Sequence, residues 1–119
     1  MAVIDVLKPL VQSGISAGIS TARSQGQALR ADIDNLIKPQ MEDVVKQIAS
    51  ITEARLADRI EDDQAQDAIR TQLDRIQPLL LALGELSLLA VQTIVNAILD
   101  AIKQGVDGIL QGAIGITLL

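Results

Sequence analysis

The sequence predicts an all-α protein: a long antiparallel helical hairpin, with kinks near Pro39 and Pro78, packed in a homo-oligomeric assembly. The chain of 119 residues is 49% hydrophobic but holds no Phe, Trp or Tyr, so aliphatic side chains carry that share. It has only 8 glycines and 3 prolines, which predicts few turns. Apolar residues recur at steps of three and four through residues 33–60, as on one face of a helix. Because the aromatic strand formers are absent, this composition favours helix over strand.

Charge divides the chain into three segments of one helical-hairpin subunit, residues 1–119. Residues 1–31 form a charge-poor arm with four charged residues. Residues 32–77 form a charged amphipathic middle with seventeen, and residues 78–119 form an apolar arm with four. The net charge is −5, and the middle segment alone has a net charge of −5 because the two arms, at +2 and −2, cancel. This order predicts that a polar centre is flanked by two arms that need cover from water.

The middle segment holds the predicted turn of the hairpin. Its apolar stripe stops at Glu61, Asp62 and Asp63 and restarts at Ala65. Asp63 with Gln66 three residues later is an acceptable N-terminal cap of a second helix. We therefore expect an acidic helix–helix turn near residues 61–64. The alternative is one uninterrupted helix, because Glu, Asp and Gln also occur inside helices.

Two arms of nearly equal length follow from that turn. At a rise of about 1.5 Å per residue, each continuous arm would span roughly 80–90 Å. Pro9, Pro39 and Pro78 each remove a helical hydrogen bond, so each should kink or break its helix. No Gly/Ser-rich linker accompanies Pro39 or Pro78, which favours bends or short breaks over loops.

Small residues at four-residue spacing predict close helix packing. Such spacing lets two helix backbones approach each other, and packing would offset the cost of glycine in a helix. A turn near residue 62 would put Gly18 level with about residue 106. The alternative is that these glycines, together with nearby serines, mark frayed ends or linkers. The predicted helix-packing residues are Gly14, Gly18, Ala22, Gly26, Ala97, Ala101, Gly105, Gly108 and Gly112.

The apolar arm contains a run long enough to cross a bilayer. Residues 79–99 are 21 residues with one charge, Glu85. No Trp or Tyr marks an interface and no Lys/Arg cluster flanks the run. Other copies of the chain could cover the same surface in an oligomer, and we favour this over lipid. The residues expected on this assembly or membrane arm are Leu79, Leu80, Leu83, Leu86, Leu89, Ile94, Ile98 and Ile102.

Composition excludes many kinds of chemistry. The chain has no His and no Cys, so Ser-His-Asp and Cys-His catalysis are impossible and common zinc sites lack their ligands. The acidic balance and missing aromatics argue against nucleic-acid binding. The acidic residues near position 62 lack the spacing of a calcium loop and fit a solvated turn better. We expect no enzyme activity, no metal, no cofactor and no small-molecule substrate.

These patterns predict a structural subunit that self-assembles into a ring, tube or filament, such as part of a virion or appendage. Its expected partner is itself, and a lipid membrane is a second candidate. A membrane-inserting pore- or channel-forming protein is the alternative, and an amphipathic coat on a lipid or granule surface is a third. The start of the chain shows no cleavable signal peptide, and the sequence indicates no particular compartment.

Overall fold

The computed structural model describes residues 2–119 and confirms that the chain is all-helical. These residues contain five α-helices and no strand. The folded chain measures 45 × 22 × 19 Å along its principal axes. The helices are α1 (Val3–Ser24), α2 (Ile33–Leu56), α3 (Asp62–Leu73), α4 (Ile76–Ala82) and α5 (Leu88–Ile114).

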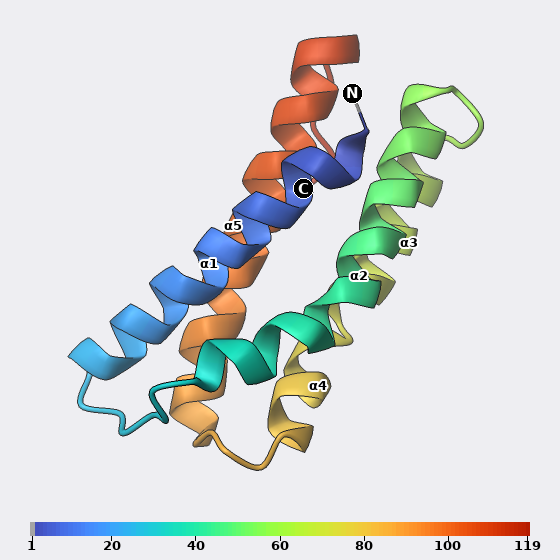
Figure 1. Cartoon of the computed structure of the whole chain (residues 1–119). Helices are drawn as coiled ribbons and strands as arrows, with labels where there is room; N and C mark the ends of the chain where they lie inside the picture. Colours follow the sequence, from blue (N-terminus) through green and yellow to red (C-terminus); the bar gives the residue numbers. More distant parts are fainter. Residues whose placement is uncertain (1) are drawn as a thin grey trace.

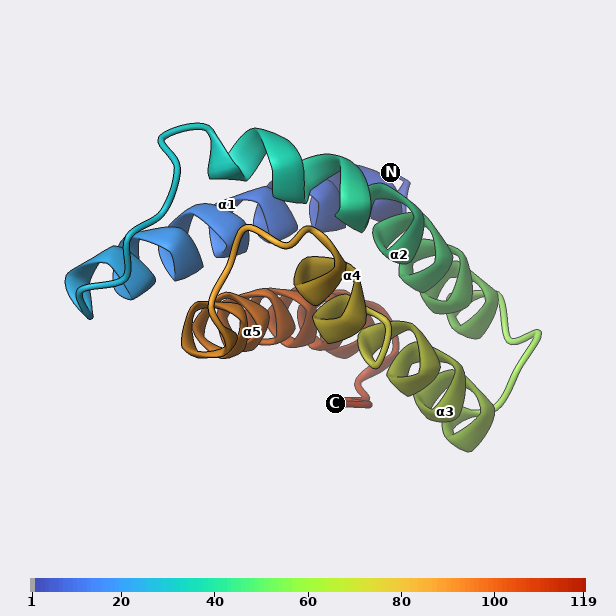
Figure 2. The same ribbon diagram turned by 90° about the horizontal axis from the view of Figure 1, so that it is seen from below.

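The helices form an antiparallel bundle in which α3 and α4 together act as one broken helix (Figure 1). The α1 helix packs along both α5 and α2, and α2 packs against α3. Figure 2 shows α1 and α2 on one side of the bundle, with α3, α4 and α5 on the other. The chain therefore makes four passes along the bundle, each antiparallel to the one before it.

Each predicted arm is folded back on itself, which differs from the long hairpin expected from the sequence. Residues 25–32 separate α1 from α2, and residues 83–87 separate α4 from α5. As a result the longest dimension is 45 Å instead of the roughly 80–90 Å of a continuous arm. Glycine explains both breaks: Gly26 has φ +84° and Gly84 has φ +70°, a left-handed conformation that ends helices.

The break between α1 and α2 has the hydrogen bonds of a Schellman motif. The Gln27 N–H donates to Ala22 O at 3.0 Å, and the Gly26 N–H donates to Arg23 O at 3.0 Å. Gly26 therefore ends α1 and does not continue its packed face, which corrects its expected place among the helix-packing residues.

A turn also separates α2 from α3, at residues 57–61, so an uninterrupted helix is excluded. The end of α2 is a second Schellman-like closure, with Asp58 in the left-handed region at φ 57°. The cap of α3 is Glu61, whose backbone N–H donates to Gln64 Oε1 at 2.9 Å. This pair replaces the predicted Asp63 and Gln66, two residues earlier in the chain, because the helix begins earlier.

The prolines act in two ways. Pro39 lies inside α2, and Figure 1 shows this helix changing direction part-way along its length. Pro78 lies in the first turn of α4, where a missing N–H is tolerated. Because Pro78 cannot donate to the carbonyl of Asp74, the helix breaks between α3 and α4 at residues 74–75.

One aliphatic core runs the length of the bundle. Its largest fully buried side chains come from every helix, and the C-terminal tail adds the buried Leu118. Both N–H groups of Leu118 and Leu119 donate to Asp107 Oδ1, at 2.8 and 3.0 Å, which holds this tail back against α5. The largest fully buried side chains are those of Leu7, Ile15, Ile33, Ile37, Met41, Ile48, Ile69, Ile76, Leu80, Ile94, Ile98 and Ile102.

This core changes the interpretation of the apolar arm. Leu80, Ile94, Ile98 and Ile102 are buried within the chain's own bundle, so neither lipid nor other copies are needed to cover them. The apolar run of residues 79–99 is divided between α4 and α5 and is not one helix. Among residues 2–119, no helix combines the length and the hydropathy of a membrane span.

Candidate assembly surface

Small residues allow α1 and α5 to pack backbone against backbone. A methyl group placed on Gly14 would lie 2.9 Å from Ala101 Cβ and 3.0 Å from Ala97 O. A methyl group on Gly18 would lie 2.8 Å from Ile94 Cα and 3.1 Å from Ala97 Cβ. All four distances are shorter than ordinary van der Waals contacts, so this interface has no room for a larger side chain.

The same helix pair contains two more of the predicted packing residues. Ala22 is buried on α1. Gly105 is buried on α5, where a Cβ would lie 2.6 Å from Leu7 Cδ2. Gly18 therefore lies level with residues 94–97 and not with residue 106. The expected level assumed one continuous hairpin, whereas loops at residues 25–32 and 83–87 fold each arm back on itself.

Gly108 and Gly112 do not belong to this interface. Both are exposed on α5, and a Cβ at either position would meet nothing within 4 Å. The prediction that these two glycines pack against another helix is therefore wrong for contacts within the chain. Ile114, near the C-terminal end of the same helix, is 40% exposed.

Three exposed leucines lie on either side of the connection between α4 and α5 and are here called the apolar corner. Leu81 is 43% exposed, Leu88 is 56% exposed and Leu89 is 49% exposed. Leu81 precedes the turn and the other two lie in the first turn of α5. Exposed leucines this near one another in the chain are candidates for contact with another molecule. Of the predicted apolar arm, Leu89 alone belongs to this corner, while Leu79, Leu83 and Leu86 are half-buried against the core.

Local structure fixes where the corner leucines point. Gly84 reverses the chain after α4, and Ser87 caps α5 by accepting a hydrogen bond from the Ala90 N–H at 3.1 Å. The cap places Leu88 and Leu89 at the start of the helix, while the next residues, Ala90 and Val91, enter the core.

Polar contacts hold the turn of the corner against the α1–α2 loop. The Ser87 hydroxyl donates to Gln27 Oε1 at 2.6 Å, and the Thr93 hydroxyl donates to Gln25 Oε1 at 3.0 Å. Arg30 lies 3.6 Å from Glu85, which is exposed. Arg30 donates hydrogen bonds to both carboxylate oxygens of Asp32 at 3.0 Å, and these bonds, followed by the charges of Asp32 and Glu85, raise the pKa of Arg30. The corner is therefore a braced surface.

The acidic turn lies elsewhere, at the α2–α3 connection. Glu61, Asp62 and Asp63 are exposed, and Arg55 forms an ion pair with Asp62. Hydrogen bonding to Asp62 raises the pKa of Arg55. Among residues 2–119, no group of three acidic side chains is placed to hold a metal ion.

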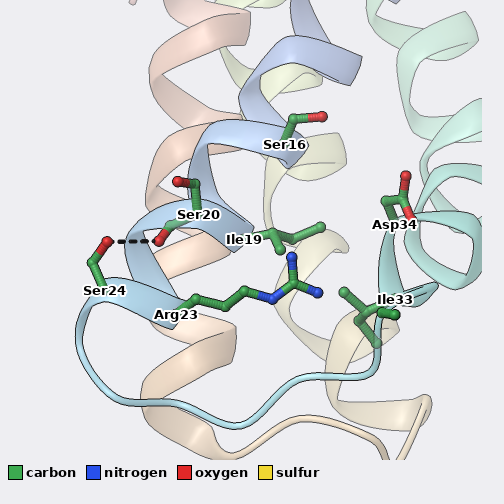
Figure 3. A pocket seen from close by; sticks show the side chains of 8 residues that line it. Ser16, Ile19, Ser20, Arg23, Ser24, Ile33 and Asp34 are labelled. Atoms are coloured by element: carbon green, nitrogen blue, oxygen red, sulfur yellow. Dashed lines mark hydrogen bonds between the residues drawn. The ribbon is translucent and has the colours of Figure 1, made fainter.

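A hollow of about 500 Å³ lies between the end of α1 and the start of α2 (Figure 3). Ser16, Ser20 and Arg23 line its α1 side, and Asp34 lies across from them on α2. The Arg23 guanidinium donates to Arg30 O at 2.8 Å, so Arg23 helps to hold the α1–α2 loop. The hollow is open to solvent, and Ile19, Ala31 and Ile33 also line it, so its wall is both polar and apolar.

Comparisons of this chain with protein-family models, with curated proteins and with solved structures find no match. Function is therefore argued from the surfaces of the bundle. The apolar corner is the surface with the strongest physical reason to contact another molecule, because burying its leucines away from water is favourable.

Proposed function

We propose that this protein is a structural subunit that self-associates through the apolar corner. The observation that supports the proposal is the exposure of Leu81, Leu88 and Leu89 at one braced turn, on a chain that buries most of its other large aliphatic side chains. Burying such a surface against a second copy removes leucine from water without breaking the core.

The free energy available favours weak, repeated contacts. Full burial of a leucine is worth about 2 kcal/mol, so each half-exposed corner leucine offers about 1 kcal/mol. In a corner-to-corner contact, three leucines on each of two copies then offer about 6 kcal/mol, and in a head-to-tail contact three leucines with Ile114 offer about 4 kcal/mol. The association cost is about 4–15 kcal/mol. We therefore infer association that depends strongly on concentration, and that becomes stable when each subunit makes more than one contact.

A second exposed surface supports an open assembly. Ile114 is 40% exposed and lies at the end of α5 opposite Leu88. The two ends of α5 are about 40 Å apart, since a helix rises about 1.5 Å per residue. Contact between the apolar corner of one copy and the Ile114 end of the next is head-to-tail, and such contacts generate rings or filaments. We therefore propose that the subunit builds a tube or filament, such as part of a virion or appendage.

The extended hairpin is a second form proposed for the assembled subunit. It would require residues 25–32 and 83–87 to become helical. Gly26 and Gly84 can adopt helical angles without steric cost. Subunit length separates the two forms, because the compact bundle is 45 Å long and the hairpin would approach 80–90 Å.

The test is the solution mass in detergent-free buffer, measured by light scattering over a range of concentrations. Wild-type protein should grow in mass with concentration, and the double variant Leu88→Gln/Leu89→Gln should stay monomeric. The variant Ile114→Gln should also stop growth if contacts are head-to-tail, whereas a symmetric corner-to-corner dimer would survive it. The matched control Gln104→Ser, on an exposed part of α5, should behave as wild type. A wild-type monomer at every concentration would overturn the proposal.

The apolar corner also supports a second candidate, a coat protein on a lipid or granule surface. Exposed leucines at a helix start can enter the boundary of a lipid layer without a helix crossing it. Sedimentation with vesicles that depends on Leu88 and Leu89 would favour this function. Leakage of vesicle contents would instead favour the membrane-inserting alternative.

A further inference from the structure

A narrow groove between α1 and α2 combines a buried aliphatic floor with lysines at its rim. Its cavity has a volume of about 150 Å³. Val11 and Ile15 of α1 and Met41 and Val45 of α2 form the floor, and all four are buried in the core. This groove belongs to α1 and α2, whereas the apolar corner belongs to α4 and α5. Figure 2 shows these two pairs of helices on opposite sides of the bundle.

The charge of the rim is opposite to that of the whole chain. Lys8, Lys38 and Lys46 line the groove together with one acid, Glu42, so the rim has a net charge of +2. The chain as a whole has a net charge of −5. Lys38 lies 3.5 Å from Asp34. Among residues 2–119, Lys8 and Lys46 form no ion pair, so both ammonium groups are free to meet an anion.

Size and chemistry together select one class of ligand. An apolar cavity of about 150 Å³ is large enough to hold a small hydrocarbon group and too small for a helix or a two-chain lipid. Lysine stems are aliphatic and their ammonium groups reach outward, so the rim can contact both a hydrocarbon chain and a charged end. Grooves between helices of a bundle, apolar inside and polar at the edge, are common ligand sites.

We propose that the α1–α2 groove binds a single-chain aliphatic carboxylate, such as a fatty-acid anion, with the first few carbons of its chain on the Val11–Met41 floor and the rest of a longer chain extending out of the groove. The carboxylate lies between Lys8 and Lys46 and accepts hydrogen bonds from their ammonium groups. This ligand class was not expected from the sequence, where the lysines are spread over two helices. The proposal does not depend on self-association.

Methionine offers a direct probe of the groove. The chain has two methionines, and Met41 is the one in the floor. With methyl-labelled methionine, decanoate below its micelle concentration should shift the Met41 methyl NMR signal in a saturable way. Decanol tests the chain without the charge, and acetate tests the charge without the chain. Both should bind more weakly than decanoate.

Charge reversal at the rim tests the site itself. Lys8→Glu/Lys46→Glu should weaken decanoate binding by about tenfold or more, because two surface attractions become repulsions. Lys103→Glu, an exposed lysine on α5, is the matched control and should leave the affinity unchanged. The titrations are run in the Leu88→Gln/Leu89→Gln background, so that binding at the apolar corner cannot contribute.

Three outcomes would overturn the proposal. A Met41 signal that does not move with decanoate would show that the groove is closed to chains. Equal binding of decanol and decanoate, or equal loss in both lysine variants, would show that the rim does not select a carboxylate. Response to anionic vesicles alone, with none to free decanoate, would assign the lysines to a membrane surface instead.

Discussion

Replacing Gly18 by alanine isolates the close approach of α1 and α5. The new methyl group would lie 2.8 Å from Ile94 Cα and 3.1 Å from Ala97 Cβ. Alanine gains about 1 kcal/mol over glycine in a helix interior. Overpacking against a backbone atom costs about 1–3 kcal/mol, since Ile94 Cα cannot move without shifting α5. We expect Gly18→Ala to lower the free energy of unfolding by about 1 kcal/mol, with larger residues costing more.

Gly108→Ala is the matched control for this effect. Gly108 is also inside a helix, but a Cβ there would meet nothing within 4 Å. This variant should raise the free energy of unfolding by about 1 kcal/mol, from helix propensity alone. Urea unfolding followed by far-UV circular dichroism measures both, since the chain has no Trp or Tyr to follow by fluorescence. Equal stabilisation by the two alanines would refute the close packing of α1 on α5.

Further substitutions test the ends of the helices. Asp58→Gly should stabilise the chain by about 1 kcal/mol in urea unfolding, because Asp58 has φ 57° and glycine adopts that angle without strain; no gain would contradict a left-handed turn there. Glu53→Ala should cost about 1 kcal/mol in the same assay, because Glu53 Oε1 accepts the N–H of Val3 at 3.1 Å, whereas Glu53→Gln keeps the acceptor and most of the stability. Asp107→Ala should speed amide hydrogen exchange at Leu118 and Leu119, whose N–H groups Asp107 holds; unchanged exchange would show that the tail is held by apolar packing alone.

The sequence predicts the helical content well because its apolar residues recur every three to four positions, as they do on one face of a helix. The stripe from Ile33 to Ile60 gives one buried face, and the acidic interruption at residues 61–63 gives the end of the pattern. The structure has a turn there, within a few residues of the expected place.

The two loops that fold the arms could not be predicted from the same signal. Gly26 continues the four-residue spacing of Gly14 and Gly18, so spacing alone assigns it to the packed face. Its left-handed angle depends on where the chain must turn to bury α2 against α1, which is a tertiary effect. Gly84 has an aliphatic run on both sides, and Ser87 three residues later is the signal of a new helix that could have revealed this turn.

The apolar corner was missed for a related reason. Nearly every position in residues 79–91 is apolar, so periodicity does not tell which leucines face the core. The outward positions of Leu81 and Leu88 follow from the turn at Gly84 and from the cap at Ser87. The groove lysines were equally hidden, since Lys8 and Lys46 meet only when α1 folds along α2.

Sedimentation equilibrium of the wild-type chain beside Leu88→Gln/Leu89→Gln is the decisive test of self-association through the apolar corner. We expect the wild-type mass to rise above the 12.6 kDa of one chain as concentration increases, and the variant to stay at 12.6 kDa with an unchanged circular dichroism spectrum. A wild-type mass of one chain at all concentrations, or an equal rise in the variant, would contradict self-association through the apolar corner.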